Sequence, residues 1–184
     1  MISRLIDWVD SNNDLIRKKW GLCETLEIGD NIETGKYISS SKWDPVSNIS
    51  KYAAVSYWKQ DGPVSQELND PDESTERELI VTYPLVQRVF VKRDYLSKDN
   101  PCSVDELFHM LNDRNTEPKA ADRATLGIQN LKIFFNGYTT DIEGILEEDF
   151  GDEGKASSFL KYLVLSLNIE IEVLLTNDCY TDPC

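Results

Sequence analysis

The sequence lacks the residue patterns that mark the common enzyme classes. It contains a single histidine, His109, and no nucleophile stands at a recognisable motif spacing for it to activate. The neighbours Phe108 and Met110 are core-type residues, so we expect His109 to be structural. The nine glycines form neither a GxGxxG nor a P-loop pattern, so the phosphate-binding fingerprints are missing as well. We expect no catalytic residue and no cofactor.

Cysteine is also scarce, with four residues in 184. Cys23 and Cys102 are isolated, and Cys179 and Cys184 lack the second closely spaced pair that structural zinc needs. A run of acids does not fit a calcium-binding loop, because its middle holds Phe and Gly in place of alternating oxygen ligands. The acids of this run are Glu143, Glu147, Glu148, Asp149, Asp152 and Glu153. We expect no metal site and interpret the run as a solvated face.

Positive charge is in short supply. Lys and Arg number 19 against 33 Asp and Glu, which gives a formal net charge of −14. Such a surface repels phosphate backbones and anionic lipid, so we expect no direct nucleic-acid partner and no membrane partner. The acidity either selects basic protein partners or only keeps the chain soluble.

Long apolar runs are missing too. No stretch approaches the roughly 20 residues that a membrane-spanning helix needs. The first ten residues carry charges every few positions, so they do not resemble a secretory signal. We therefore expect a cytoplasmic protein, or a virion component if it is a phage protein.

What is present begins with an amphipathic pattern. Ile2, Leu5, Ile6 and Val9 recur at three- and four-residue spacing, which predicts an N-terminal helix. The pattern resumes over 16–20, ahead of a glycine that could end the helix. We expect the four aliphatic side chains to face either the core or a neighbouring subunit.

A strand-rich region follows, from Leu22 to Leu96. Short segments rich in β-branched and aromatic residues alternate there with turn residues, which predicts four or five strands. The expected strands are Leu22–Ile28, a short one at Tyr37–Ile38, Tyr52–Trp58, Glu78–Tyr83 and Leu85–Lys92.

An acidic excursion interrupts these strands at about 61–78. We expect it to be an exposed loop and an interaction element, because it is too polar for the core and rich in turn residues. Its acids are Asp61, Glu67, Asp70, Asp72, Glu73, Glu76 and Glu78.

Helix signals return after residue 100. Ser103 and Glu106 have the spacing of a capping box, and Thr140 with Glu143 repeats it. The segment Ala120–Phe135 is predicted to be a helix closed by Asn-Gly. We interpret 158–175 as a helix followed by a closing strand over 168–173.

These patterns predict one α+β domain over 1–184: an N-terminal amphipathic helix, an antiparallel or mixed sheet of about five strands, C-terminal helices and a closing strand. We expect a non-enzymatic assembly protein whose partners are copies of itself or other subunits. Small neck, connector or tail-completion subunits of tailed phages have this size and build. The alternative is an acidic inhibitor, such as an immunity protein or nucleic-acid mimic, that covers a basic partner. An unrecognised enzyme is the third option.

Overall fold

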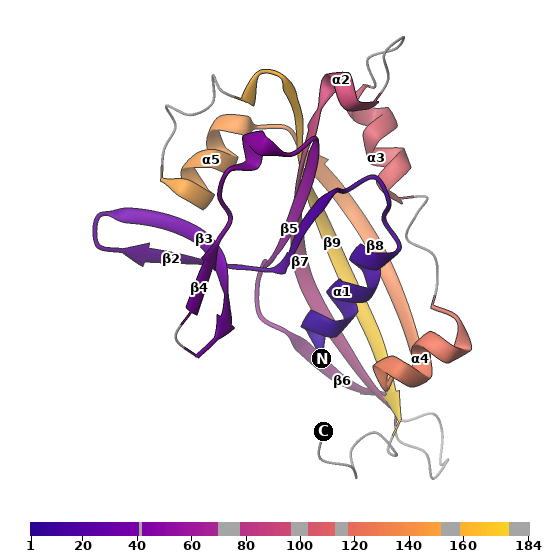
Figure 1. Cartoon of the computed structure of the whole chain (residues 1–184). Coiled ribbons are helices and arrows are strands. Elements are labelled where there is room, and N and C mark those ends of the chain that lie inside the picture. Colours follow the sequence, from indigo (N-terminus) through magenta and orange to yellow (C-terminus); the bar gives the residue numbers. More distant parts are fainter. Residues whose placement is uncertain (41, 70–77, 97–102, 113–117, 152–158, 177–184) are drawn as a thin grey trace.

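The computed structural model describes residues 1–40, 42–69, 78–96, 103–112, 118–151 and 159–176 and confirms an α+β fold (Figure 1). Its centre is a mixed sheet of six strands. Five of them follow the order β1 (Lys18–Leu22), β5 (Ala54–Gln60), β7 (Glu78–Lys92), β9 (Tyr162–Thr176), β8 (Asn130–Thr139). The sixth, β6 (Ser65–Asn69), pairs with β7. Only the β1–β5 pair is parallel.

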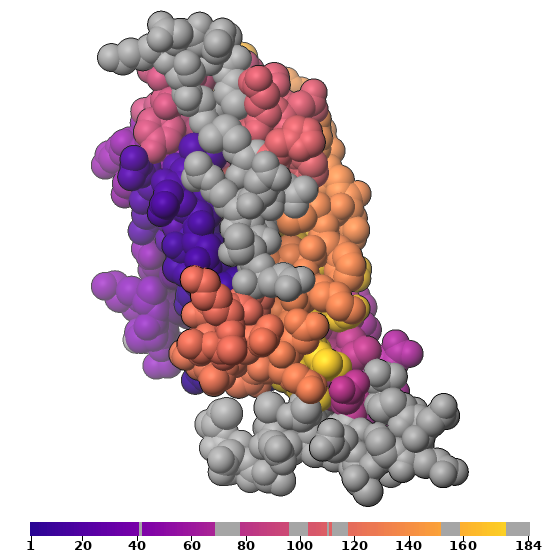
Figure 2. Space-filling model, turned by 90° about the vertical axis from the view of Figure 1, so that its right-hand side faces the viewer, coloured from indigo at the N-terminus to yellow at the C-terminus, as the bar shows by residue number. Residues whose placement is uncertain are grey.

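The longest pairing joins β7 to β9. These two 15-residue strands run antiparallel over their whole length, from the pair Glu78 and Thr176 to the pair Lys92 and Tyr162. β8 adds to the other side of β9 and forms one margin of the sheet. In Figure 2, β8 (orange) lies along the surface and only a narrow strip of β9 (yellow) is visible beside it.

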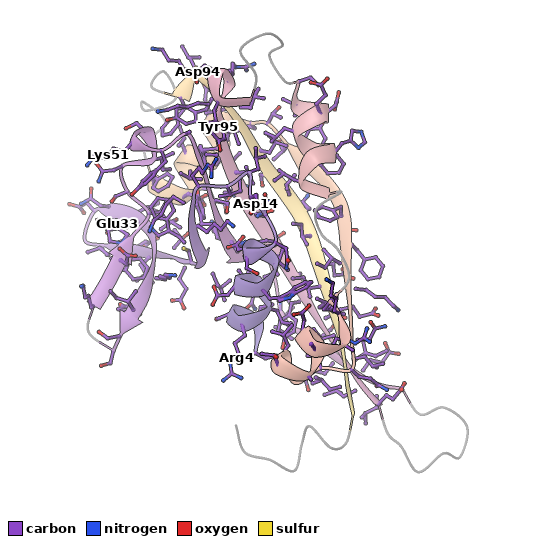
Figure 3. The ribbon with its side chains drawn as sticks, turned by 45° about the vertical axis from the view of Figure 1, so that its right-hand side comes forward. Arg4, Asp14, Glu33, Lys51, Asp94 and Tyr95 are labelled. Carbon is purple, nitrogen blue, oxygen red and sulfur yellow. The ribbon has the colours of Figure 1, made fainter. Side chains whose placement is uncertain are left out.

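Three helices pack on one face of this sheet: α1 (Ile2–Ser11), α3 (Val104–Asn112) and α4 (Ala120–Leu126). Leu5, Ile6 and Val9 are at most 3% exposed, and Ile2 packs partly buried against the same cluster. The aliphatic side of α1 therefore contacts this chain's own core, whereas Arg4 points away from the sheet (Figure 3).

The capping box predicted at Ser103 is confirmed. The Glu106 amide donates to Ser103 Oγ at 3.1 Å, and the Ser103 amide donates to Glu106 Oε2 at 2.8 Å. Leu107 and Leu111 of this helix, α3, are buried. A short helix, α2 (Arg93–Leu96), continues directly from the end of β7.

The opposite face of the sheet is covered at one end by α5 (Ile142–Phe150) and by the 3-10 turn η1 (Ile49–Lys51). Ile145 and Leu146 of α5 pack there against aromatic residues of the sheet, among them Tyr57 and Phe90. A helix therefore does begin where the capping-box spacing of Thr140 and Glu143 indicated one. Its cap is not Thr140 but Asp141, whose carboxylate accepts the Gly144 amide at 3.1 Å.

A second, three-stranded antiparallel sheet stands beside the main one, formed by β2 (Glu24–Ile28), β3 (Asn31–Ser39) and β4 (Lys42–Pro45). It occupies the left of Figure 1 and contacts the rest of the chain mainly through α5. β3 and β4 approach closely at Gly35, where an added Cβ would lie 2.6 Å from the Asp44 carbonyl oxygen.

Two helix predictions were wrong. The segment 16–20 does not continue the N-terminal helix, because Lys18–Leu22 is β1, whose main chain bonds to β5. The segment predicted as one helix over Ala120–Phe135 is helical only to Leu126, and Gly127 then adopts φ +70° and ends it. From Asn130 onward the chain is β8, with Leu131, Ile133 and Phe135 alternating toward the core.

The C-terminal prediction was half wrong. A helix was expected before 168, but Tyr162–Thr176 is a single strand. Its first half is buried on both faces, because Leu163 and Leu165 face the helices while Tyr162 and Val164 face the α5 side. A strand buried on both faces shows a continuous apolar run, which can be mistaken for a helix.

The acidic excursion was predicted as a loop, and part of it is a strand. Ser65–Asn69 is β6, paired antiparallel with β7 from Ser65 opposite Thr82 to Asn69 opposite Glu78. Leu68 is its only aliphatic residue, so the sequence showed no alternation to indicate a strand. Residues 70–77 lie outside the described residues.

Candidate functional site

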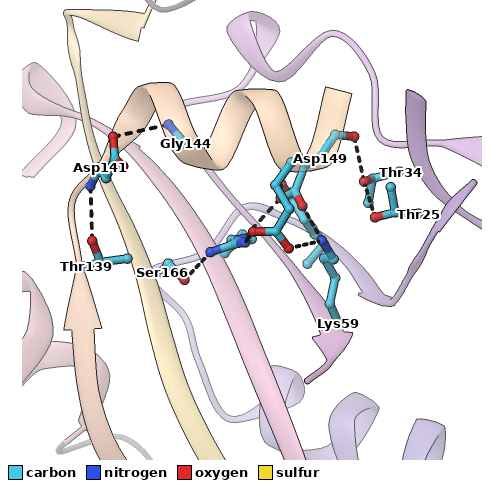
Figure 4. Close-up of polar contacts among 11 residues, drawn as sticks. Thr25, Thr34, Lys59, Thr139, Asp141, Gly144, Asp149 and Ser166 are labelled. Carbon is cyan, nitrogen blue, oxygen red and sulfur yellow. Dashed lines mark hydrogen bonds and ion pairs between the residues drawn. The ribbon is translucent and has the colours of Figure 1, made fainter. Parts of the chain in front are cut away.

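The most concentrated polar chemistry of the fold is a buried ion network beneath α5 (Figure 4). Its centre is Asp149, whose side chain is completely buried. One carboxylate oxygen, Oδ2, accepts hydrogen bonds from the Tyr57 hydroxyl at 2.5 Å and from Arg88 Nε at 3.1 Å. The other oxygen, Oδ1, accepts from the ammonium of Lys59.

A second carboxylate closes the network from the solvent side. Glu148 Oε1 accepts from Lys59 Nζ at 2.6 Å, and its Oε2 accepts from Arg88. Arg88 also donates to the hydroxyl of Ser166. Two cations and two anions therefore share one site, with Asp149 enclosed and the Glu148 side chain 57% exposed.

Four elements supply this network. Alternation along β5 places Tyr57 and Lys59 on the α5 side of the sheet, and Arg88 of β7 and Ser166 of β9 lie on that side opposite each other. The last turn of α5 brings both acids down onto them. The network thus fixes α5 over the middle strands β5, β7 and β9, towards one end of the sheet.

The network perturbs the ionisation of two of its members. Burial raises the pKa of the Tyr57 phenol well above its ordinary value, and the charge of Asp149 adds to this effect. Burial pushes the pKa of Glu148 upward, but hydrogen bonds and charges from Lys59 and Arg88 outweigh it, so the pKa is lowered. The tyrosine therefore stays protonated and both cations face carboxylates.

Asp149 also links α5 to the three-stranded sheet. The main-chain carbonyl of Asp149 accepts from Thr34 Oγ1 of β3 at 2.8 Å, and Thr34 meets Thr25 of β2 at 2.9 Å. Both oxygens of the Asp149 carboxylate are occupied by partners from the chain itself. Each acid and base of this group has a partner within the chain, and together they join α5 to both sheets.

A second buried acid, Asp10, lies at the end of α1. Its Oδ1 accepts from Trp58 Nε1 at 3.0 Å, while Oδ2 is buried without a hydrogen-bond partner among the described residues. Lys19 donates to the main-chain carbonyl of Asp10. Burial raises the pKa of the Asp10 carboxyl from 3.8 to about 6.

A hollow of about 360 Å³ lies between α5 and the turn around η1. Leu146, Phe150 and Phe159 supply its apolar wall, and Ser47 to Ser50 form the opposite side. None of the described residues that line it has a titratable side chain.

The residues singled out in the sequence do not form one site. Leu5, Ile6 and Val9 are core residues of α1. Asp61 lies exposed just after β5, and Glu67 is exposed on β6. Glu78 is the first residue of β7, and the other four acids of the excursion, Asp70, Asp72, Glu73 and Glu76, lie outside the described residues.

His109 is exposed on α3 with its ring against Phe108, and no hydrogen bond to it is found in the described part of the chain. Cys23 is a buried free thiol. The other three cysteines lie outside the described residues.

Sequence reasoning missed the network beneath α5. The acidic run 143–153 was interpreted as a solvated face, yet Asp149 is its most buried member in the described range. One signal was available: Arg88 stands inside the apolar run Leu85–Val91, and a charge in a buried strand needs a counter-ion. The identity of that counter-ion could not be read from spacing, because it lies some sixty positions away.

Within the described residues, no group of three or more His, Cys, Asp or Glu side chains is placed to hold a metal ion. No helix in the described ranges is long and apolar enough to cross a bilayer. Compared with known proteins, the chain matches no family model and no curated protein.

Proposed function

We propose that this chain is a non-enzymatic assembly subunit and that the three-stranded sheet β2–β3–β4 is its contact surface. The observation that carries the proposal is an exposed apolar face on this sheet. Ile28 is 46% exposed and Tyr37 is 56% exposed. Figure 3 shows Glu33 of the same sheet at the side of the molecule away from α4 and β8.

Register places these side chains on one face. Tyr37 lies opposite Trp43, and their rings meet edge to face with centroids 5.0 Å apart. Leu26 lies opposite Glu33, so Leu26 and Ile28 share that face. Thr34 points the other way, toward Asp149. The face with Leu26, Ile28, Tyr37 and Trp43, called the outer face here, is therefore turned away from α5.

An exposed face of this composition favours a protein partner. Clustered aromatic and aliphatic side chains on a surface mark interaction sites more often than isolated ones do. Tyr and Trp are enriched at the centres of protein interfaces because they bury large areas at low entropic cost.

The face is also held rigidly, which lowers the cost of binding. Val46 donates its amide to the Thr34 carbonyl at 2.7 Å, which ties the end of β4 to β3. Trp43 Nε1 donates to Glu33 at 3.2 Å and orients the indole.

The most concrete form of the proposal is a neck, connector or tail-completion subunit of a tailed phage, with other copies or neighbouring subunits as partners. It rests on size and build, on an apolar patch outside the core, and on buried polar groups that serve the fold. A cytoplasmic or virion location belongs to the same proposal.

The proposal is tested by sedimentation and light scattering over a range of protein concentrations. We expect the wild type to form an oligomer and the double variant Ile28→Ser, Tyr37→Ser to lose it while staying folded. Leu160→Ser is the matched control, because Leu160 is 71% exposed and lies elsewhere. A wild type that stays monomeric at every concentration would refute self-assembly, and equal loss in the control would refute the assignment of the surface.

A further inference from the structure

Among the described residues, the second face of the six-stranded sheet is covered at only one end. Even-numbered residues of β7 point toward this face, because Phe90 packs in the α5-side core while Val81, Leu85 and Val89 pack in the helix-side core. α5 reaches the sheet at the level of Arg88. Beyond it, toward Glu78, lie Ile80, Thr82 and Pro84 of β7, each only partly buried.

The neighbouring strands continue this open face. Ile80 of β7 lies opposite Leu174 of β9, and Glu170 lies opposite Phe134 of β8. Phe134 is 40% exposed, and Ile80 and Leu174 are partly exposed. Ile80 and Leu174, together with Lys132 and Glu172, help line a hollow of about 130 Å³. The open face therefore combines accessible apolar side chains with a depression the size of one side chain.

Its charge is mostly negative. Glu67 of β6 lies opposite Ile80, and Glu170 and Glu172 lie on β9, where both are partly exposed. The cation among them, Lys132, pairs with Glu172 at 3.0 Å. In the part of the chain that the structure describes, no ion pair joins Glu67 or Glu170 to a cation.

We propose that this open face binds a basic amphipathic helix of a partner protein. Apolar side chains of the helix contact Ile80, Leu174 and Phe134, while its lysines or arginines reach Glu170 and Glu67. Charge complementarity of this kind speeds association and selects the partner. The chain's net charge of −14 adds a long-range attraction for a basic partner.

A helix fits better than an extended peptide. Extended peptides bind to the edges of sheets, where main-chain groups are free. In the middle of this face the main chains of β7 and β9 are paired on both sides, so only side chains are available there. Strands lie about 4.8 Å apart and a helix is about 10 Å across, so one helix lies over two to three strands.

This surface is distinct from the outer face of β2–β4, so the inference stands or falls independently of the assembly role. The test measures fluorescence anisotropy of a labelled synthetic helix of leucine and lysine at helical spacing. A peptide of the same composition in scrambled order and a leucine–glutamate helix serve as comparison probes. Variants are Glu170→Lys and Phe134→Ser, with Glu147→Lys on the exposed side of α5 as a control for net charge.

We expect the leucine–lysine helix to bind at least about tenfold more weakly to Glu170→Lys, in line with the loss of one well-placed charge contact. Phe134→Ser should also weaken binding, whereas Glu147→Lys should bind like the wild type. The scrambled and acidic peptides should bind more weakly than the leucine–lysine helix.

Two results would overturn the proposal. Equal weakening in Glu147→Lys and Glu170→Lys would show that only net charge attracts the peptide. Unchanged binding in both Glu170→Lys and Phe134→Ser would place the peptide elsewhere. Circular dichroism of each variant confirms that the fold is kept, and Phe134→Ser gives a second reading that does not depend on charge.

Discussion

Asp10 gives the sharpest prediction, because the structure places a carboxylate in the core without full compensation. The residue is 4% exposed, and burial raises its pKa from 3.8 to about 6. A shift of this size corresponds to about 3 kcal/mol of destabilisation whenever the group is ionised, at roughly 1.4 kcal/mol per pKa unit. Asp10→Asn removes the charge and keeps an oxygen that can accept from Trp58. The new amide group lacks a partner, which costs about 1–3 kcal/mol, so the net gain near pH 8 should be about 2 kcal/mol at most.

The direction in which the stability changes with pH follows from proton linkage. The folded state binds the proton more tightly than the unfolded state, since the folded pKa is about 6 and the ordinary value is 3.8. The full cost is therefore present above the folded pKa. As the pH falls through about 6, the folded state takes up the proton and the cost is progressively relieved, until the unfolded state is protonated as well.

The assay is denaturant unfolding of wild type and Asp10→Asn from about pH 8 down to about pH 4, with the free energies subtracted at each pH. The advantage of the variant should shrink across the interval between the two pKa values. Asp14→Asn is the control, since Asp14 is exposed just beyond the end of the same helix. An advantage that stays constant with pH, or a variant less stable than wild type near pH 8, would refute the reasoning.

Three further substitutions test the packing by denaturant unfolding. Asp149→Ala leaves Arg88 and Lys59 without their buried counter-ion, so we expect a loss of about 3–5 kcal/mol; a loss below 1 kcal/mol, as at an exposed pair, would contradict the anchoring role. Gly35→Ala drives a methyl group against the Asp44 carbonyl and should cost about 1–3 kcal/mol, and an unchanged stability would show that β3 and β4 separate freely. Ser103→Ala removes the cap of α3 and should lower the stability by about 1 kcal/mol. Ser103→Asp should retain most of the stability that the cap provides.

The sequence predicted those elements whose signals are local. The amphipathic period of α1 and the cap at Ser103 depend on residues three or four apart, and both were confirmed. β8 was missed because a true helix precedes it and Gly127 was not taken as the end of that helix. The long β9 was missed in its first half, where burial on both faces removes the alternation that marks a strand.

The buried network could be predicted only in part. Arg88 in an apolar strand required a counter-ion, and that requirement was visible in the sequence. Its partner could not be chosen among six neighbouring acids, because helical geometry and the β5–β7–β9 register together decide which one points inward. The contacts between distant strands determine which acid pairs with Arg88, and local residue spacing does not show it.

The pairing of β7 with β9 has a consequence for synthesis on the ribosome. β7 receives its longest partner only after the chain has been made as far as Thr176, later than every other strand described. Until then, one side of β7 presents an unbonded apolar edge, and α3, α4 and α5 have no completed surface on which to dock. Strand pairing between segments far apart in the sequence forms slowly, and until it forms the unpaired edges are open to other chains. We therefore expect nascent chains stalled before β9 to need chaperone protection. Chains that are released with β9 should no longer need it.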